Sequence, residues 1–130
     1  IVGFPGETEE MFAESLDYIR SLGFSRVHVF PYSPREGTPA ASMPDQIPDN
    51  IKKERVHRLQ QVAEEMTRAF HEQYLGTKQK VLWETRTKGV TDGVTDTYIR
   101  VYTKADVIPG EITEVKLERL YEDGVWGISE

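Results

Sequence analysis

The sequence predicts a mixed chain, α/β in its first part and all-β in its second. A strand, a helix and a second strand follow one another at the start, and one long helix comes after them. Beyond that helix, the apolar residues change from a helical period to alternation in short runs separated by turn residues. We therefore expect a βαβ unit and a long helix at 1–76, and a small antiparallel β-barrel of about five strands at 77–130.

The composition suits a soluble protein made of two small units. The chain has 130 residues, of which 38% are hydrophobic and 29% charged, and its net charge is −6. It contains no apolar run long enough to span a bilayer, so no membrane role and a cytoplasmic location are expected. With 0 cysteines it offers no disulfide and no thiolate ligand for zinc or iron. The acidic balance argues against indiscriminate binding of nucleic acids, although it does not exclude a local basic face.

The first 30 residues are expected to form the βαβ unit. Residues 1–4 resemble the end of a buried strand, and we expect the chain to begin within a fold. Thr8 can cap a helix whose apolar stripe contains Phe12 and which stops at Gly23. Residues 26–30 then predict a second, parallel strand, in which His28 is expected as an interior histidine with satisfied hydrogen bonds. Two parallel strands cannot bury their own faces, so self-association through exposed edges is expected.

Periodicity predicts the remaining elements. A loop at 32–48 leads to a helix that Asp49 or Asn50 can cap and that ends at Gly76. Its apolar stripe comprises Ile51, Val56, Leu59, Ala63, Met66, Phe70 and Tyr74. The clearest strand signals are at 80–84, 97–102, 111–117 and 125–128. Turns are expected at Lys88-Gly89, Asp92-Gly93, Pro109-Gly110 and Asp123-Gly124.

Two loops in the first part carry candidate binding residues. The segment 3–8, Gly-Phe-Pro-Gly-Glu-Thr, joins a strand end to a helix start, where free N–H groups and glycines permit close approach of a ligand. The segment 30–40 follows the next strand and offers the ring of Tyr32 and the planar fork of Arg35. Each segment is equally compatible with a plain connection: a strand-to-helix turn in the first case, a proline-stiffened loop in the second.

Taken together, the two motifs are more specific than either alone. Gly-Phe-Pro-Gly-Glu-Thr, followed by Phe-Pro-Tyr-Ser-Pro-Arg-Glu-Gly-Thr-Pro-Ala-Ala, resembles the late barrel strands of the radical-SAM methylthiotransferases. The pattern Gly93-x-x-Asp96-x-Tyr98-Ile99-Arg100-Val101 resembles the TRAM domain, the small OB-like β-barrel that ends those enzymes. The resemblance implies the end of a radical-SAM α/β barrel followed by a TRAM barrel. Pro31 and Glu36 make it most similar to the branch that modifies threonylcarbamoyladenosine in tRNA.

The resemblance also implies cofactors that this chain cannot hold alone. The family uses S-adenosylmethionine and two 4Fe-4S clusters held by cysteines that are absent here, so we expect no catalytic residue, no metal ligand and no activity from this piece. The missing N-terminal part of the protein would be its partner. By resemblance, the residues expected near the adenosine part of S-adenosylmethionine are Gly3, Phe4, Gly6, Glu7, Phe30, Tyr32 and Arg35.

Charge is unevenly distributed in the β-domain. Between 78 and 104, six basic residues face three acidic ones, whereas between 105 and 130 only two basic residues face seven acidic ones. Cationic grooves with aromatic rings bind RNA in small barrels. The expected RNA-binding residues are Lys78, Lys80, Arg86, Lys88, Tyr98, Arg100 and Lys104. Alternatively, the rings fill the core and the lysines are ordinary surface; this suits Trp83 better than stacking, and for Tyr98 both interpretations stay open.

The function expected from these observations is that of the C-terminal part of a tRNA methylthiotransferase. Such an enzyme adds a methylthio group to a modified adenosine next to the anticodon, and tRNA is then the partner of the β-domain. One alternative is a stand-alone barrel that binds RNA or protein. Another is the ribosomal-protein methylthiotransferase branch, in which the β-domain would grip a protein.

Overall fold

The computed structural model describes all residues from 1 to 130, which form two compact units. The first unit comprises Ile1–Thr67 and the second Arg68–Glu130. The division falls inside the long helix α2 (Asp49–Tyr74), whose last two turns therefore pack with the second unit. No helix is both long and apolar enough to cross a membrane.

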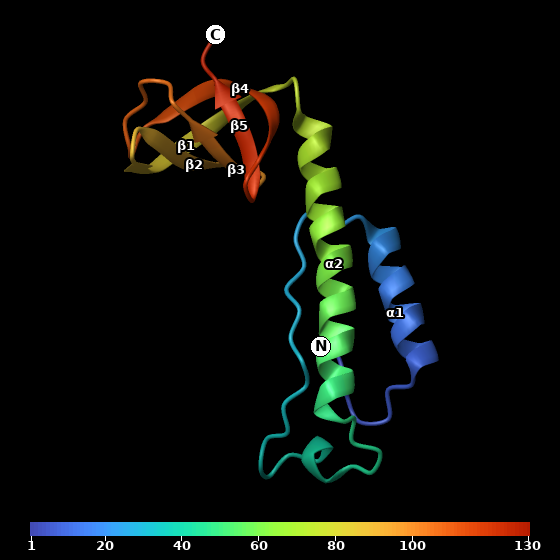
Figure 1. Cartoon of the computed structure of the whole chain (residues 1–130). Coiled ribbons are helices and arrows are strands. Elements are labelled where there is room, and N and C mark those ends of the chain that lie inside the picture. Colours follow the sequence, from blue (N-terminus) through green and yellow to red (C-terminus); the bar gives the residue numbers. More distant parts are fainter. The chain divides into compact units, whose positions relative to one another are not determined.

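Helix α1 (Glu9–Leu22) begins and ends as its sequence predicts (Figure 1). The Thr8 hydroxyl accepts a hydrogen bond from the Met11 backbone N–H at 3.1 Å, which satisfies one of the free donors of the first turn. Gly23 ends the helix in the left-handed region with φ at 64°. Phe12 is buried against Val2 and Leu59, so the predicted apolar stripe does face the core of the first unit.

The prediction of a second strand at 26–30 is wrong. The segment is irregular, and only one parallel bridge, between Val2 and Pro31, joins it to the start of the chain. The expected parallel direction is thus present, but two short segments without neighbouring strands cannot sustain a ladder. His28 is exposed rather than interior, whereas its neighbour Val29 packs against the core of the first unit.

A short 3-10 helix η1 (Ala40–Ser42) precedes α2, which runs from Asp49 to Tyr74. The start of α2 differs from the predicted cap, because Asp49 already belongs to the helix. The Pro48 carbonyl accepts hydrogen bonds from the N–H groups of Ile51 and Lys52, both at 3.1 Å. As predicted, the helix stops just before Gly76, which has φ at 85°.

The second unit contains a closed barrel in the strand order β1-β2-β3-β5-β4. Its strands are β1 (Lys78–Thr87), β2 (Val90–Thr95), β3 (Arg100–Thr103), β4 (Ile112–Tyr121) and β5 (Gly124–Ile128). The prediction of a small five-stranded barrel is confirmed. It was wrong in one respect, because β3 and β5 run parallel and the barrel is therefore not wholly antiparallel. This pattern is that of an OB-like barrel.

The predicted turn at Asp92-Gly93 does not exist, because both residues lie inside β2. Gly93 does not reverse the chain; it allows strand β1 to lie close to the backbone of β2. A β-carbon at Gly93 would lie 2.4 Å from the Leu82 carbonyl oxygen and 2.9 Å from the Trp83 ring. Glycine inside a strand commonly marks such a contact, so the same dipeptide has two structural uses that sequence alone does not separate.

The interior of the barrel is mainly apolar, and the end of α2 packs against it. Its fully buried apolar residues are Val81, Trp83, Ile99, Val101, Leu117 and Val125, and the polar Thr91 and Thr103 are also fully buried. Phe70, Tyr74 and Leu75 pack against this cluster. The last turns of α2 and the residue that follows thus cover part of the barrel core.

Candidate functional site

The predicted ligand loop at the start of the chain is held by an ion pair from α2. Oε1 of Glu7 accepts hydrogen bonds from the Gly3 N–H at 3.0 Å and from Arg55 Nη1 at 2.9 Å. Arg55 also donates to the Glu7 carbonyl and is almost fully buried. The Glu7 carboxylate therefore closes the turn instead of facing a ligand.

Tyr32 lies at the centre of the same region. Its ring meets Phe4 edge to face with centroids 5.5 Å apart, and Lys52 donates from Nζ to its carbonyl oxygen at 3.1 Å. The Tyr32 hydroxyl is buried without a hydrogen-bond partner. A buried hydroxyl of this kind is costly unless water or a ligand satisfies it.

The other residues predicted for the cofactor are engaged mainly through their backbones. The Gly6 N–H donates to the Asp45 carbonyl at 2.9 Å, and the Phe30 carbonyl accepts from Val2 at 2.9 Å. The N–H groups that were expected to be free at the turn are thus already satisfied. The Phe30 ring is 61% exposed, whereas Arg35 is exposed and only its carbonyl is engaged, by Thr38. The structure brings Gly3, Phe4, Glu7 and Tyr32 together and leaves Arg35 outside this hydrogen-bonded cluster.

Sequence reasoning missed Lys52 and Arg55, the two α2 residues that hold these loops. The stem of Lys52 packs on Gly3, where a β-carbon would lie 2.5 Å from its Cγ. A signal was present, because both charged residues lie at helical spacing from Leu59 on the buried face of α2. Charged side chains at apolar positions of an amphipathic helix indicate a specific polar partner.

In the β-barrel, the predicted RNA contact Arg100 is already paired with acidic neighbours. Its Nη1 donates to carboxylates of Glu84 and Asp92, the latter at 2.8 Å. The hydrogen bond with Glu84 raises the pKa of Arg100, and burial opposes this only in part. Much of its charge is therefore neutralised within the protein.

The other predicted basic residues differ in whether their side chains are already paired with acceptors of the protein. Arg86 donates to the Val107 carbonyl at 2.5 Å and lies 3.6 Å from Asp106, while Lys78 lies 3.5 Å from Glu130. Lys80, Lys88 and Lys104 are exposed. Lys116, expected on the acidic side, lies opposite Lys78 in the β1–β4 pairing and shares Glu130 with it. The barrel thus mixes the two charge groups that the sequence separates.

The two aromatic residues left open are placed in opposite environments. Trp83 is fully buried and donates from Nε1 to the Thr113 hydroxyl at 2.7 Å, which confirms the core interpretation. Tyr98 is 84% exposed, which rules out a core role. It sits in the turn between β2 and β3 with φ at 64°, a strained conformation for an aromatic residue. The exposed ring is available to stack on a ligand.

A further group of side chains lies on the outside of the barrel, here called the aromatic face: Tyr102 of β3, Arg119 and Tyr121 of β4, and Trp126 of β5. The Tyr121 ring contacts Tyr102 at 5.2 Å and Trp126 at 4.9 Å between centroids. The guanidinium of Arg119 lies 5.0 Å from the Trp126 ring centre. Sequence reasoning noted Tyr102 among the basic residues and placed Arg119 on the acidic side, where its replacement was expected to matter much less for RNA binding. Strand alternation at Tyr121 and Trp126 was the available signal for the other two.

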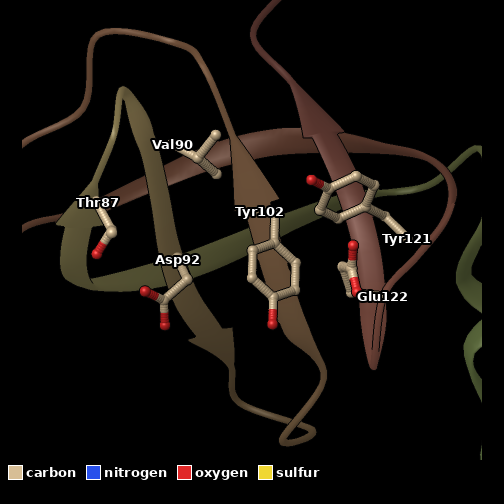
Figure 2. Close-up of a pocket in the computed structure, with 6 residues that line it drawn as sticks. All are labelled: Thr87, Val90, Asp92, Tyr102, Tyr121 and Glu122. Carbon is tan, nitrogen blue, oxygen red and sulfur yellow. The ribbon is translucent and has the colours of Figure 1, made fainter.

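Beside the aromatic face lies an open pocket of about 270 Å³ lined by Thr87, Val90, Asp92, Tyr102, Tyr121 and Glu122 (Figure 2). The figure shows the Tyr102 and Tyr121 rings next to each other, with Asp92 beside Tyr102. Burial, helped by a hydrogen bond that Tyr102 donates to Asp123, raises the pKa of Tyr102 to about 12. Its hydroxyl therefore stays protonated at neutral pH. No three histidine or carboxylate groups lie close enough to hold a metal ion.

The strand order and this outer face identify the class of domain. The second unit is an OB-like barrel, an architecture that binds oligonucleotides and oligosaccharides through its outer strands and loops. No family model matches the chain. Individual proteins do match it. The chain is 44% identical over 124 residues, 90% of its length, to threonylcarbamoyladenosine tRNA methylthiotransferase MtaB of Bacillus subtilis, and 38% identical over 126 residues to MtaB of Thermotoga maritima.

Relatives of a second kind match as well. The tRNA-2-methylthio-N(6)-dimethylallyladenosine synthase of Aquifex aeolicus is 42% identical over 118 residues. Over most of its length, the chain is therefore homologous to a segment of tRNA methylthiotransferases, which confirms the resemblance found in its motifs. It spans 27% of the Bacillus protein and 29% of the Thermotoga protein.

Proposed function

We propose that this chain is the RNA-recruiting part of a tRNA methylthiotransferase that acts in the cytoplasm. The observation that carries the proposal is its 44% identity to MtaB of Bacillus subtilis across 90% of the chain, which takes in both units. The tRNA substrate would be held by the OB-like barrel. Support comes from the exposed Tyr98 ring and from the exposed lysines Lys80, Lys88 and Lys104.

We further propose that the modified base is threonylcarbamoyladenosine. Supporting this are two MtaB relatives and the Pro31 and Glu36 pattern in the second loop. Dimethylallyladenosine is the second candidate, because synthases for that nucleotide match at 38% to 46% identity.

For S-adenosylmethionine, the first unit supplies exposed rings, and Arg35 is the predicted charged contact whose side chain forms no ion pair. Phe4 and Phe30 are partly exposed rings, and the Tyr32 hydroxyl is a buried group without a partner, so a flat, weakly polar adenine fits here. The N–H groups of Gly3 and Gly6 are occupied, so they fit no anionic group. The cofactor would supply radical chemistry only with cysteine-held clusters from the rest of the protein, since this chain has 0 cysteines.

Binding of tRNA to the 130-residue chain tests the recruiting role. Affinity should fall linearly with salt on logarithmic axes, because neutralised phosphates release counterions. Binding that does not depend on salt, or no binding at all, would argue against it. If the chain belonged to the ribosomal-protein branch, it should instead show no affinity for tRNA.

A chimera tests the enzyme and its nucleotide together. The matching segment of Bacillus subtilis MtaB is replaced by this chain, and tRNA from cells lacking MtaB is analysed by mass spectrometry. We expect the methylthio group on threonylcarbamoyladenosine to return. Its appearance on dimethylallyladenosine instead would correct the nucleotide, and its absence from both, with the chimera folded and cluster-loaded, would count against the proposal.

A further inference from the structure

The aromatic face is built from three strands that the barrel closure places next to one another. β5 pairs with β3 on one side and with β4 on the other. In these pairings Trp126 lies opposite both Tyr102 and Arg119. Residues from 102 to 126 thus come together on one surface, and only the pairing of distant strands brings this about.

Arg119 is the arginine of this barrel that forms no ion pair with a carboxylate. The ion pairs of the barrel involve Lys78, Arg86, Arg100 and Lys116, and Arg119 is not among them. Its guanidinium lies 5.0 Å from the Trp126 ring centre and 5.7 Å from that of Tyr121. Contact with aromatic rings orients the planar fork while its N–H groups remain available for an external acceptor.

An irregularity in β4 puts this positive charge in place. Leu117 pairs with Gly127, so regular pairing would set Glu118 opposite Trp126, yet the register shifts and Arg119 stands there. Bulges of this kind re-aim side chains and are frequent beside binding sites. The shift exchanges a carboxylate for a guanidinium next to the ring.

The pocket beside the face has a different polarity. Asp92 and Glu122 offer carboxylate oxygens between the β1–β2 and β4–β5 connections, where the lining residues Thr87, Val90 and Tyr121 also lie. A ligand therefore meets flat rings, one free guanidinium and hydrogen-bond acceptors within one area.

We propose that the aromatic face binds an unpaired nucleobase of RNA together with its phosphate. The base stacks on the rings, its amino group donates toward the pocket carboxylates, and the phosphate accepts from Arg119. An acidic peptide would satisfy Arg119 but would bring no flat base with an amino group for the rings and the pocket carboxylates. The inference rests on the proposed RNA-binding function and moves its centre from Arg100, which is neutralised by Glu84 and Asp92, to Arg119.

The test uses the full 130-residue chain and a short, fluorescein-labelled single-stranded RNA of mixed sequence. Trp126→Leu, which loses a base stack, and Arg119→Ala, which loses the phosphate contact, should each weaken binding about fivefold or more. Arg119→Lys, which keeps charge but loses the planar fork, should not restore full affinity. The control Lys116→Ala should change affinity by less than about twofold, because this side chain is paired with Glu130 outside the pocket.

Tryptophan fluorescence of the unmodified chain gives a second measurement that does not depend on any variant folding. The chain has two tryptophans, and Trp83 is fully buried, so quenching by RNA reports Trp126. We expect quenching with single-stranded RNA and little with the same RNA annealed to its complement.

The outcomes separate this inference from the function it rests on. If the unmodified chain binds no RNA, both are overturned. If the chain binds RNA without quenching of tryptophan fluorescence, the RNA-binding function stands and the aromatic face is not the site. The same conclusion follows if Arg119→Ala and Lys116→Ala lose equal affinity for RNA. If Arg119→Ala changes only the sedimentation of the chain, the face is a contact between copies and the inference fails.

Discussion

Trp83 and Thr113 are joined across the β1–β4 part of the barrel by a hydrogen bond of 2.7 Å from the indole Nε1 to the hydroxyl. The indole is fully buried, so this bond satisfies the one polar atom of the largest core side chain. Thr113→Val should lower the free energy of unfolding by about 1–3 kcal/mol, since the indole N–H loses its partner. Urea unfolding measures the effect. Thr113→Ser keeps the hydroxyl and should lose less; equal losses from both variants would show that the methyl contact matters instead.

Arg55 should contribute more to the stability of the first unit than Arg58 does. Both are arginines of α2 that reach carboxylates on or before α1, but Arg55 is buried with Glu7 whereas Arg58 pairs with the exposed Glu9. Arg55→Ala leaves the Glu7 carboxylate and carbonyl without their donor and should cost about 2–4 kcal/mol. Arg58→Ala should cost less than about 1 kcal/mol. Thermal unfolding of the two variants compares their stabilities. A larger loss of stability from Arg58→Ala than from Arg55→Ala would contradict the stabilising role of the buried Arg55–Glu7 pair.

Acid should weaken the second unit through His71. Burial lowers the pKa of His71, and the nearby Asp123 opposes this only in part. The unfolded chain therefore takes up a proton on this residue at higher pH than the folded one, so stability falls as pH drops below about 6.5. Unfolding free energies measured between about pH 7.5 and 5.5 should show this loss, and His71→Gln should reduce it. His57→Gln, at an exposed position of the same helix, should leave the slope unchanged.

This chain alone should form no iron–sulfur cluster. Offered iron, sulfide, reductant and S-adenosylmethionine, it has 0 cysteines with which to hold iron. We expect neither cluster absorbance nor 5′-deoxyadenosine. Appearance of both, with loss on adding a chelator, would contradict the assignment of cluster binding to other parts of the protein.

The sequence by itself determined the elements that rest on local chemistry. Thr8 and Gly23 bound α1, Gly76 follows the end of α2, and the Lys88-Gly89 turn separates β1 from β2. Each depends on a hydrogen bond or a φ angle that neighbouring residues set. The motifs of the two loops likewise sufficed to indicate the family that the similar proteins then showed.

Only the tertiary structure decided what depends on partners distant in the chain. Asp92-Gly93 was predicted as a turn, because nothing local reveals that β1 approaches Gly93. The strand at 26–30 fails because its ladder would need strands on its open sides. Arg100 and Arg119 look alike in a charge count, yet closure of the barrel pairs the first with Glu84 and Asp92, and a register shift sets the second beside Trp126. Local chemistry fixes caps and turns, whereas the neutralisation or freedom of a charge depends on which strands meet.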